Sequence, residues 1–376
     1  MFVATNTLLY NLCMNRKQPN YILLALALIL LLLGLAFLAN VSGVNSQQIH
    51  NDVYFDLKNQ IILGVLPGLF LFLLFYYILD YRKLKKFALI ALIINFVLLL
   101  LCFVPFLQIA NATAARWIAI GNFSFQPSEF LKITFILFLA SWLSSKSKDE
   151  IKNFKKTTFP FLILFGLISI PIALQPSTSP LVILGGTALV MAIASGVRFN
   201  QIFTIFAIGA IVIALLITFM PGQYRKDRIQ SYLRPPGDQT QMGQSLISIG
   251  SGGLWGLGFG KSVQKHSYVP ESSSDSIFAI VAEELGFIGV IGIILLFFLF
   301  LLAGFQVAKG APDDFGKYLA IGLTTWIVWQ AFVNIGVSCG AIPMMGLPLP
   351  FFSSGGTALM VTIGSLGILA NISKQN

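Results

Sequence analysis

The chain has 376 residues, of which 56% are hydrophobic and only 10% are charged. A soluble domain carries about 25% charged residues, so this composition excludes soluble enzymes, fibrous chains and disordered proteins and indicates a polytopic membrane protein. The formal net charge of +10 would suggest nucleic acid as a partner of a soluble protein, but in a membrane protein it reflects topology, and we expect no nucleic-acid partner.

Ten apolar segments are candidates to cross a membrane, for which a helix needs about 20 largely apolar residues. In chain order the predicted spans are 21–41, 61–79, 87–107, 130–143, 159–174, 181–197, 202–220, 285–307, 318–339 and 357–372. We therefore expect an all-α fold with one transmembrane domain over residues 21–373. A tail of residues 1–20 precedes it, residues 374–376 follow it, and a long outer loop, 221–274, separates the seventh and eighth spans.

The cations are unevenly divided between alternate loops, which predicts the orientation. Fifteen of the 24 Lys and Arg fall on one side: Arg16, Lys17, Arg82, Lys83, Lys85, Lys86, Lys146, Lys148, Lys152, Lys155, Lys156, Arg198, Lys309, Lys317 and Lys374. The positive-inside rule then places both termini in the cytoplasm of a multi-pass protein of the cytoplasmic membrane. Three cysteines and two histidines without paired spacing predict neither a disulfide framework nor a His-ligated metal.

Ionisable groups at membrane depth need a partner or a task, and the first such cluster lies before the fourth span. Arg116 is followed by Gln126-Pro127-Ser128-Glu129, with Lys132 three residues further on. Pro127 or Ser128 can start a helix, and Glu129 and Lys132 then share one face as an i,i+3 ion pair. The alternative to a functional pair is a structural one that holds the entry of the helix.

A second cluster lies in the long outer loop, where Arg225 and Arg228 could hold a phosphate or anchor lipid headgroups. A glycine-rich stretch, 250–260, follows in the same loop. It does not follow a strand of a βαβ unit, so we do not interpret it as a nucleotide site. We expect flexible backbone over the mouth of a cavity instead.

The third cluster holds four carboxylates before the eighth span: Glu271, Asp275, Glu283 and Glu284. If the eighth helix begins near Ser274, Asp275 lies in its first turn, reachable from the outer solvent, and the two later acids lie about 12 Å deeper. Helix capping is the simpler explanation for Ser274 or Asp275. Four acids opposite the cations of the other clusters favour a site that surrounds chemistry.

The last outer loop, 342–356, contains three prolines and several glycines directly before the tenth span. Broken helix at membrane depth is tolerated where the backbone is buried in protein or lines a cavity. The free N–H groups at the start of the tenth helix could receive an anion. A tight re-entrant turn without a ligand is the alternative.

Several discontinuous motifs occur in order over residues 20–372 and resemble those of the SEDS family (shape, elongation, division and sporulation). They are Arg116-Trp117-Ile118, Gln126-Pro127-Ser128-Glu129 with Lys132, Arg225 and Arg228, Gln244-Ser245-Leu246 leading into Gly250-Ser251-Gly252-Gly253, Pro270-Glu271 with Asp275-Ser276-Ile277-Phe278-Ala279, Glu283-Glu284-Leu285-Gly286, and Asn334 through Pro350-Phe351 to Gly355-Gly356. Residues 260–271 are more similar to the division type of the family, with the elongation type as second choice.

The resemblance implies a peptidoglycan glycosyltransferase that polymerises lipid II at the outer membrane face in septal cell-wall synthesis. It also implies a class B penicillin-binding protein as crosslinking partner, together with other division proteins, the growing glycan strand and membrane lipid. Asp275 occupies the position of the family's essential carboxylate, and Glu129 with Lys132 that of its buried ion pair. The implied substrate-binding residues are Arg116, Glu129, Lys132, Arg225, Arg228, Glu271 and Ser353.

The chain departs from the family pattern at four places. Ser177 stands where the family usually has an acid, Ser273-Ser274 replace a His-Thr pair, Met344-Met345 replace two threonines, and Ser354 replaces a tyrosine. These departures concern the finer substrate contacts and leave the acid at Asp275 in place.

Glycosyl transfer from lipid II requires a base for a sugar hydroxyl and positive charge for a leaving pyrophosphate. Asp275 is the candidate base, or holds a divalent ion, Mg²⁺ or Mn²⁺, that orients the groups; no nucleotide is required. Arg116, Arg225, Arg228 or Lys132 would stabilise the pyrophosphate. Two other functions fit ten helices with intramembrane charges: a lipid II flippase or secondary carrier, and an inactive scaffold for the transpeptidase.

Overall fold

The computed structural model describes residues 18–107, 116–121, 123–175, 179–219, 232, 237, 240–265 and 273–375. Its helices are α2 (Tyr21–His50), α3 (Phe55–Gln60), α4 (Leu66–Leu73), α5 (Tyr81–Leu101), α6 (Pro127–Ser144), α7 (Lys148–Ile151), α8 (Phe159–Leu174), α9 (Ser179–Ser195), α10 (Phe199–Phe219), α12 (Gln241–Ser251), α13 (Ile277–Gly310), α14 (Asp314–Ser338) and α15 (Gly356–Lys374). Short π-helical turns at Ile61–Val65, Leu74–Ile78 and Phe154–Thr158 extend α3, α4 and α8, and Pro105–Leu107 form one 3₁₀ turn.

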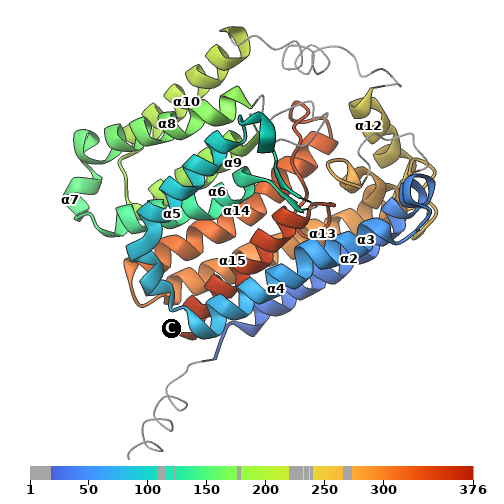
Figure 1. Ribbon diagram of the computed structural model, residues 1–376, viewed down its shortest axis with the longest axis horizontal. Helices are drawn as coiled ribbons and strands as arrows, with labels where there is room; N and C mark the ends of the chain where they lie inside the picture. Colours follow the sequence, from blue (N-terminus) through green and yellow to red (C-terminus); the bar gives the residue numbers. More distant parts are fainter. Residues whose placement is uncertain are drawn as a thin grey trace, which may run out of the picture.

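Two helices, α14 and α15, form the centre of the bundle (Figure 1). Both are buried along most of their length. Helix α14 packs against α13, α9 and α6, whereas α15 packs against α4 and its two flanking π turns. The close contact with α4 depends on small residues, because a Cβ at Gly68 would lie 2.9 Å from Cβ of Ile363. Lipid-facing helices thus surround a pair of helices that are largely shielded from lipid.

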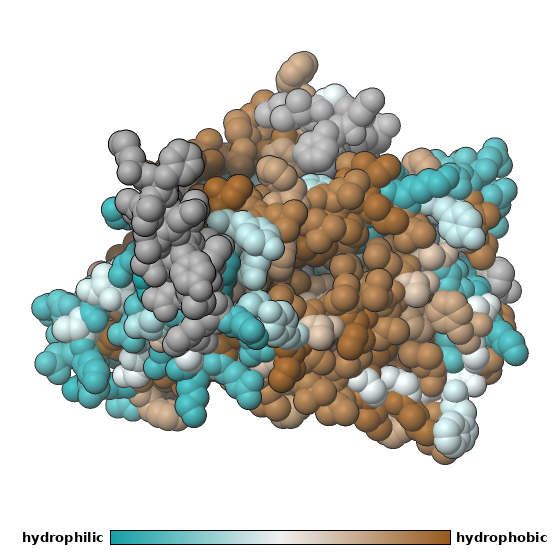
Figure 2. Space-filling view, turned by 90° about the horizontal axis from the view of Figure 1, so that it is seen from below, coloured by the Kyte–Doolittle hydropathy of each residue, from teal (hydrophilic) through white to brown (hydrophobic). Residues whose placement is uncertain are grey.

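The surface fits a protein that crosses a membrane. Figure 2 shows a broad band of apolar side chains between hydrophilic ends. Seven helical segments of the described chain are long and apolar enough to cross: Tyr21–His50, Phe55–Ile78, Tyr81–Leu101, Phe154–Leu174, Ile277–Gly310, Asp314–Ser338 and Gly356–Lys374. The helices α6, α9 and α10 occupy the other three predicted segments, so ten crossings remain a prediction.

The first and last helices begin and end on the same face. The backbone N–H of Asn20, directly before α2, donates to Ser373 Oγ near the end of α15 at 3.0 Å. The N–H of Tyr81 at the start of α5 donates to Asn371 Oδ1 at 3.2 Å, and its hydroxyl donates to Asp313. This face therefore contains the start of α2, the start of α5, the α13–α14 turn and the end of α15, as an even number of crossings requires.

Two helices are longer than expected. Helix α2 continues to His50 rather than ending near residue 41, because its polar residues have partners inside the protein: Ser46 Oγ donates to Asp56 Oδ2 at 2.8 Å, and Asn40 Nδ2 donates to Glu284. Helix α13 begins at Ile277 rather than at residue 285. Its first two turns contain buried acids, which the apolar pattern excluded from the span.

The described residues are mostly helical, as predicted, with one short strand pair that was not expected. Strands β1 (Ile118–Ile120) and β2 (Phe123–Phe125) form a short antiparallel hairpin, with Ile118 opposite Phe125. The turn uses Gly121 at φ +60°. The long outer loop also contains α12, which was not predicted. Strands of three residues are too short for a periodic signal.

The glycine-rich stretch after α12 packs its backbone against a break in α13. Gly286 interrupts α13 with φ 68° and ψ −171°, which frees backbone groups on both sides of it. Leu257 and Gly258 donate to the carbonyls of Glu283 and Glu284 at 3.0 Å each, and Phe287 donates back to Gly253 O at 2.9 Å. The prediction of a flexible cover over a cavity is therefore wrong: the glycines permit two backbones to touch.

The two acids beside this break hold the loop that follows. Glu283 accepts from Ser248 Oγ, Ser262 Oγ and the N–H of Val263, the last at 3.0 Å. Glu284 accepts from the N–H groups of Gly260 and Ser262 and lies 3.5 Å from Lys265 Nζ. Both side chains are buried. We expected these two acids around the reaction site, but the structure places them beneath the 253–263 loop as its hydrogen-bond acceptors.

The Gly256→Ala substitution should destabilise the protein strongly. Gly256 has φ +77°, and a Cβ there would lie 2.1 Å from the carbonyl oxygen of Glu284. We expect a loss of more than about 3 kcal/mol, because both the left-handed conformation and the backbone contact are lost. Thermal unfolding in detergent measures it. Gly250→Ala is the control, since its Cβ would meet nothing within 4 Å; equal unfolding temperatures for the two variants would contradict the argument.

Candidate active site

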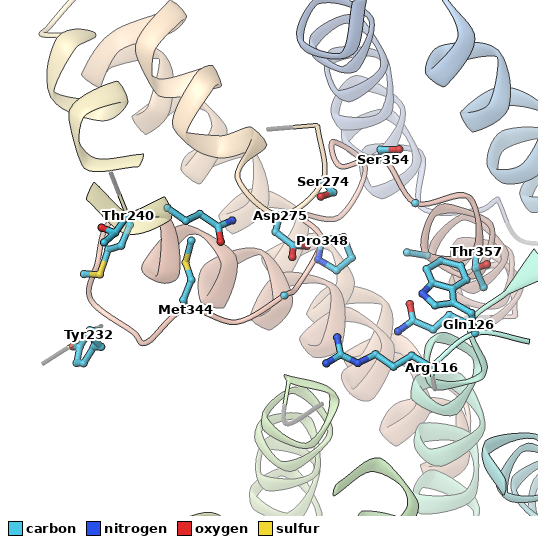
Figure 3. Close-up of a pocket in the computed structure, with 16 residues that line it drawn as sticks. Arg116, Gln126, Tyr232, Thr240, Ser274, Asp275, Met344, Pro348, Ser354 and Thr357 are labelled. Atoms are coloured by element: carbon cyan, nitrogen blue, oxygen red, sulfur yellow. The ribbon is translucent and has the colours of Figure 1, made fainter. Parts of the chain in front are cut away.

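A cavity of about 770 Å³ lies where the hairpin, α12, the turn before α13 and the α14–α15 loop meet. Figure 3 shows Asp275 and Pro348 near its middle, Arg116, Gln126 and Thr357 at one end, and Tyr232 and Thr240 at the other. An acid therefore lies between a cationic end and an end lined by neutral side chains.

The turn that contains Asp275 is held by hydrogen bonds to its own carbonyl groups. Asn334 Nδ2 on α14 donates to Asp275 O at 2.9 Å and to Leu347 O at 2.6 Å. The N–H of Ser354 donates to Ser273 O at 2.7 Å, and Ser353 Oγ donates to Ser274 O. Three consecutive carbonyls are thereby fixed, so the carboxylate leaves a rigid turn rather than a free loop.

The α14–α15 loop approaches the carboxylate closely at Gly346. A Cβ at this position would lie 3.0 Å from Asp275 Oδ2, closer than an ordinary van der Waals contact. A larger residue would displace the carboxylate, which explains a glycine at this point in the cavity wall.

The start of α15 forms part of the cavity wall near Arg116. Ser354, Gly355, Thr357 and Ala358 line the cavity here, and no side chain caps the helix at Gly355. Buried Gln60 fixes the segment from α3: it donates to Ser353 O at 3.2 Å and accepts from Gly355 N–H at 2.9 Å. A helix N-terminus with its partial positive charge therefore faces the cavity.

Arg116 supplies the full positive charge at the same end. Its Nε donates to the carbonyl of Gln175 at 3.1 Å, and Gln175 Nε2 donates in turn to Leu99 O at 3.1 Å. The guanidinium group is thus positioned by α8 and α5, while Arg116 itself lies directly before β1. Arg116 and the start of α15 combine into an electropositive end.

The predicted ion pair of Glu129 and Lys132 lies on α6 and is buried against α14. Lys132 Nζ contacts both carboxylate oxygens of Glu129 at 2.8 Å and also donates to Gln330 Oε1 at 2.8 Å. Trp326 Nε1 donates to the same Gln330 oxygen, and Gln330 Nε2 donates to Pro348 O at 2.8 Å. Since Pro348 lines the cavity, the pair is connected to the cavity wall without lining it.

The predicted site residues thus occupy three kinds of place. Asp275 and Arg116 line one cavity; Glu129 and Lys132 form the expected pair beneath it. Ser353 is buried, and its hydroxyl donates to the Asp275 turn while accepting from Leu349 N–H at 2.7 Å. Three other predicted residues lie outside the described residues: Arg225, Arg228 and Glu271.

A family model described as cell cycle protein, FtsW/RodA/SpoVE, matches residues 20–376. The chain belongs to this family. It is 37% identical to stage V sporulation protein E of Bacillus subtilis, over 96% of this chain and 99% of that one. It is 36% identical to a probable peptidoglycan glycosyltransferase FtsW of Geobacter metallireducens, over 96% of both.

Two solved structures have the same fold. One, described as a peptidoglycan synthase complex that coordinates polymerization and crosslinking, superposes with a TM-score of 0.75 at 25% identity, covering 93% of this chain and 96% of that one. The rod shape determining protein RodA of Thermus thermophilus superposes with a TM-score of 0.64 at 25% identity, covering 93% and 95%. This FtsW/RodA/SpoVE chain is thus a multi-pass membrane protein that has the family's fold over nearly its whole length.

Sequence reasoning gave no role in the site to several residues that build the cavity, although Trp117 and Gln126 belong to the family motifs. Trp117, Gln126, Gln241 and Gly346 line it, and Asn334, Gln330 and Gln60 support its walls. For the supporting residues a signal existed: each is an uncharged amide within or beside an apolar span, where an unpartnered polar group is costly. Asn334 was noticed only as part of the family resemblance.

The donor set around Asp275 does not form a protein cage for a metal. Among the residues that the structure describes, no group of three or more His, Cys, Asp or Glu side chains could hold an ion. Mg²⁺ is often bound by one or two carboxylates together with substrate phosphates, so an ion at Asp275 would need most of its ligands from substrate and water.

Replacing Ser353 by Ala should lower turnover by about 10-fold while leaving the apparent substrate affinity nearly unchanged. The hydroxyl group links Leu349 N–H to Ser274 O, so its loss loosens the Asp275 turn at a cost of about 1–3 kcal/mol. Glycan synthesis over a range of lipid II concentrations separates kcat from KM. Ser373→Ala, on the opposite face, is the control; a rise in KM alone would instead indicate a direct substrate contact.

Proposed function

We propose that this chain is a peptidoglycan glycosyltransferase that polymerises lipid II into glycan strands at the outer face of the cytoplasmic membrane, in septal wall synthesis. The observation that carries the proposal is one cavity that joins the Asp275 carboxylate to Arg116 and the uncapped start of α15. Family membership supports it, because several relatives are named as probable peptidoglycan glycosyltransferases FtsW. An elongation-type polymerase is the second choice.

The orientation follows from the two faces of the bundle. The Asp275 turn lies at the start of α13, whereas the α13–α14 turn lies with the start of α2 and the end of α15 at the other end. The cation-rich segments 82–86 and 309–317 belong to that second face. The positive-inside rule makes it cytoplasmic, so the cavity opens to the outer side, where lipid II is polymerised.

Asp275 acts on the nucleophile. The 4-hydroxyl of one GlcNAc attacks C1 of a MurNAc, the bond from C1 to undecaprenyl pyrophosphate breaks, and the anomeric centre inverts. The hydroxyl is a weak nucleophile, so its proton passes to the Asp275 carboxylate as the new bond forms. A rigid turn suits this role because the base must stay within hydrogen-bond distance of the hydroxyl.

The electropositive end stabilises the leaving group. Pyrophosphate gains negative charge as the C1–O bond breaks, and fixed positive charge at low dielectric favours that transition state. Arg116 can donate to phosphate oxygens as a fork, and the free N–H groups of α15 add a backbone anion site. Lys132 stays on its partners and contributes through the Gln330–Pro348 connection.

A class B penicillin-binding protein is the proposed partner, with other division proteins. The structural neighbour that coordinates polymerization and crosslinking supports it. A glycosyltransferase that extends strands outside the cell needs a second enzyme to crosslink them, and this chain offers no soluble domain in its described residues for that reaction.

The decisive experiment supplies labelled lipid II to the purified chain together with its transpeptidase and separates the products by size. Polymer formation supports the proposal. No polymer from a correctly assembled complex, with labelled lipid II crossing vesicle membranes, would establish the flippase alternative. If the assembled complex shows neither polymerisation nor transport of lipid II, the proposal is refuted and the scaffold function remains.

Replacing Arg116 by Ala should reduce kcat/KM for lipid II by about 10- to 100-fold, since a hydrogen bond to a charged group contributes about 1.5–3 kcal/mol. Arg116→Lys should recover part of the loss because it keeps the charge without the fork. Lys58→Ala is the control, an exposed cation of α3 that does not line the cavity. Unchanged kinetics in Arg116→Ala would remove this residue from the pyrophosphate site.

A further inference from the structure

A second cavity lies on the opposite half of the bundle, between α9, α13 and α14. It has a volume of about 410 Å³ and its walls are almost wholly apolar, formed by Val190, Ile193, Ala194, Phe305, Ala308 and Ile321. The other two lining residues are Lys309, at the end of α13, and Lys317, in the first turn of α14. An apolar groove thus has two cationic side chains at the turn that closes it.

The ammonium groups of these two lysines have no partner among the described residues. In the part of the chain that the structure describes, neither makes an ion pair or a side-chain hydrogen bond. Of the two acids between them, Asp313 is engaged elsewhere: it accepts from the Tyr81 hydroxyl, from Arg82 Nε at 3.3 Å and from Gly316 N–H at 2.8 Å.

These hydrogen bonds hold the Asp313 carboxylate on Tyr81, Arg82 and Gly316 and also favour its ionised form. Burial raises its pKa, but the bonds from Tyr81, Gly316 and Arg82 outweigh burial and hold the pKa of Asp313 below its usual range. Exposed Asp314 lies three residues before Lys317 and makes no ion pair with it among the described residues. Neither acid therefore occupies the place of a ligand between the two lysines.

The position and the apolar lining of the groove suit a lipid better than a soluble anion. Lys309 and Lys317 flank the turn between two membrane-spanning helices, where phosphate groups of lipids lie. The apolar wall extends from them into the bundle, as an acyl chain would. Basic pockets between transmembrane helices bind anionic headgroups through this combination, whereas a free phosphate ion would leave the apolar wall without a partner.

We propose that the groove between α9, α13 and α14 binds an anionic phospholipid, with its phosphate between Lys309 and Lys317 and one acyl chain along Ala194, Phe305 and Ile321. The site is separate from the Asp275 cavity and does not depend on the glycosyltransferase activity. Its ligand is a membrane component rather than a substrate.

Native mass spectrometry of the full chain in detergent tests the site, with phosphatidylglycerol and phosphatidylcholine as probes. We expect phosphatidylglycerol to bind at least about 10-fold more tightly, and the double variant Lys309→Gln/Lys317→Gln to lose most of that preference. The variant Ala194→Trp keeps both charges but fills the groove, so it should reduce occupancy of both lipids. Inorganic phosphate at equal concentration should not displace the bound lipid.

The matched control is Lys148→Gln/Lys155→Gln, which removes two exposed cations from the same face without touching the groove. Thermal unfolding of each variant verifies that it is folded. Full binding in either groove variant would overturn the proposal, as would displacement by inorganic phosphate or an equal loss in the control, since surface charge alone would then explain the binding. Recovery of a bound single-span partner helix that excludes lipid from the groove would also overturn it.

Discussion

Replacing Asp275 by Asn should abolish glycan synthesis, reducing turnover by at least about 100-fold, the lower end of what a positioned general base contributes. Asn has the same shape and keeps the backbone contacts of the turn, because Asn334 binds the Asp275 carbonyl rather than its side chain. The substitution removes the negative charge of the carboxylate and with it the ability to accept the hydroxyl proton. Polymer length and rate from labelled lipid II, measured with the transpeptidase present, give the result.

The control for this variant is Asp52→Asn, which removes a partly exposed carboxylate, paired with Lys58, from the α2–α3 turn. It should polymerise normally. A further comparison, Gly346→Ala, places a Cβ 3.0 Å from Asp275 Oδ2 and leaves the acid chemically intact but displaced. Normal polymerisation by Asp275→Asn in a folded complex would show that the base lies elsewhere.

Replacing Lys132 by Met should destabilise the protein by about 3–5 kcal/mol, because it leaves the Glu129 carboxylate buried without its cation. Lys132 is 1% exposed and contacts Glu129 and Gln330, so water cannot replace it. Thermal unfolding in detergent measures the loss. Activity should fall as well, because Gln330 loses a donor and with it the fixed contact to Pro348.

The double variant Glu129→Gln/Lys132→Met separates the two effects. It removes both charges, so most of the lost stability should return, as is found when buried pairs are replaced together. Activity should remain low if the pair positions the cavity wall through Gln330. Full activity in a stable double variant would reduce the pair to a structural feature of the helix entry.

Local spacing predicted part of the site well. Pro127 begins α6, and Glu129 and Lys132 meet at i,i+3, because both signals lie within one helical turn. The grouping of Asp275 with Arg116 came from their common place on the outer side of the predicted spans and from the family resemblance, since 159 residues separate them and no local pattern brings them together. The comparisons confirm the family, while the roles of these two residues stay predictions.

The acids at 283 and 284 show why the remainder could not be predicted. From sequence they belong to the same cluster of acids before a span as Asp275, about 12 Å deeper along the helix. Their burial depends on N–H groups of a loop about 20 residues earlier, which reach them only because Gly286 breaks the helix. A sequence pattern cannot distinguish an acid that meets substrate from one that meets backbone donors supplied by a distant turn.

This pairing of loop and helix also limits how the chain can vary in length. Between Gly253 and Val263 several backbone groups bond to α13, first to its backbone at Glu283, Glu284 and Phe287 and then to the two carboxylates. One inserted residue would shift every later donor away from its acceptor. Outside its left-handed glycines, the segment 253–263 should therefore tolerate substitution far better than insertion or deletion, unlike an ordinary surface loop.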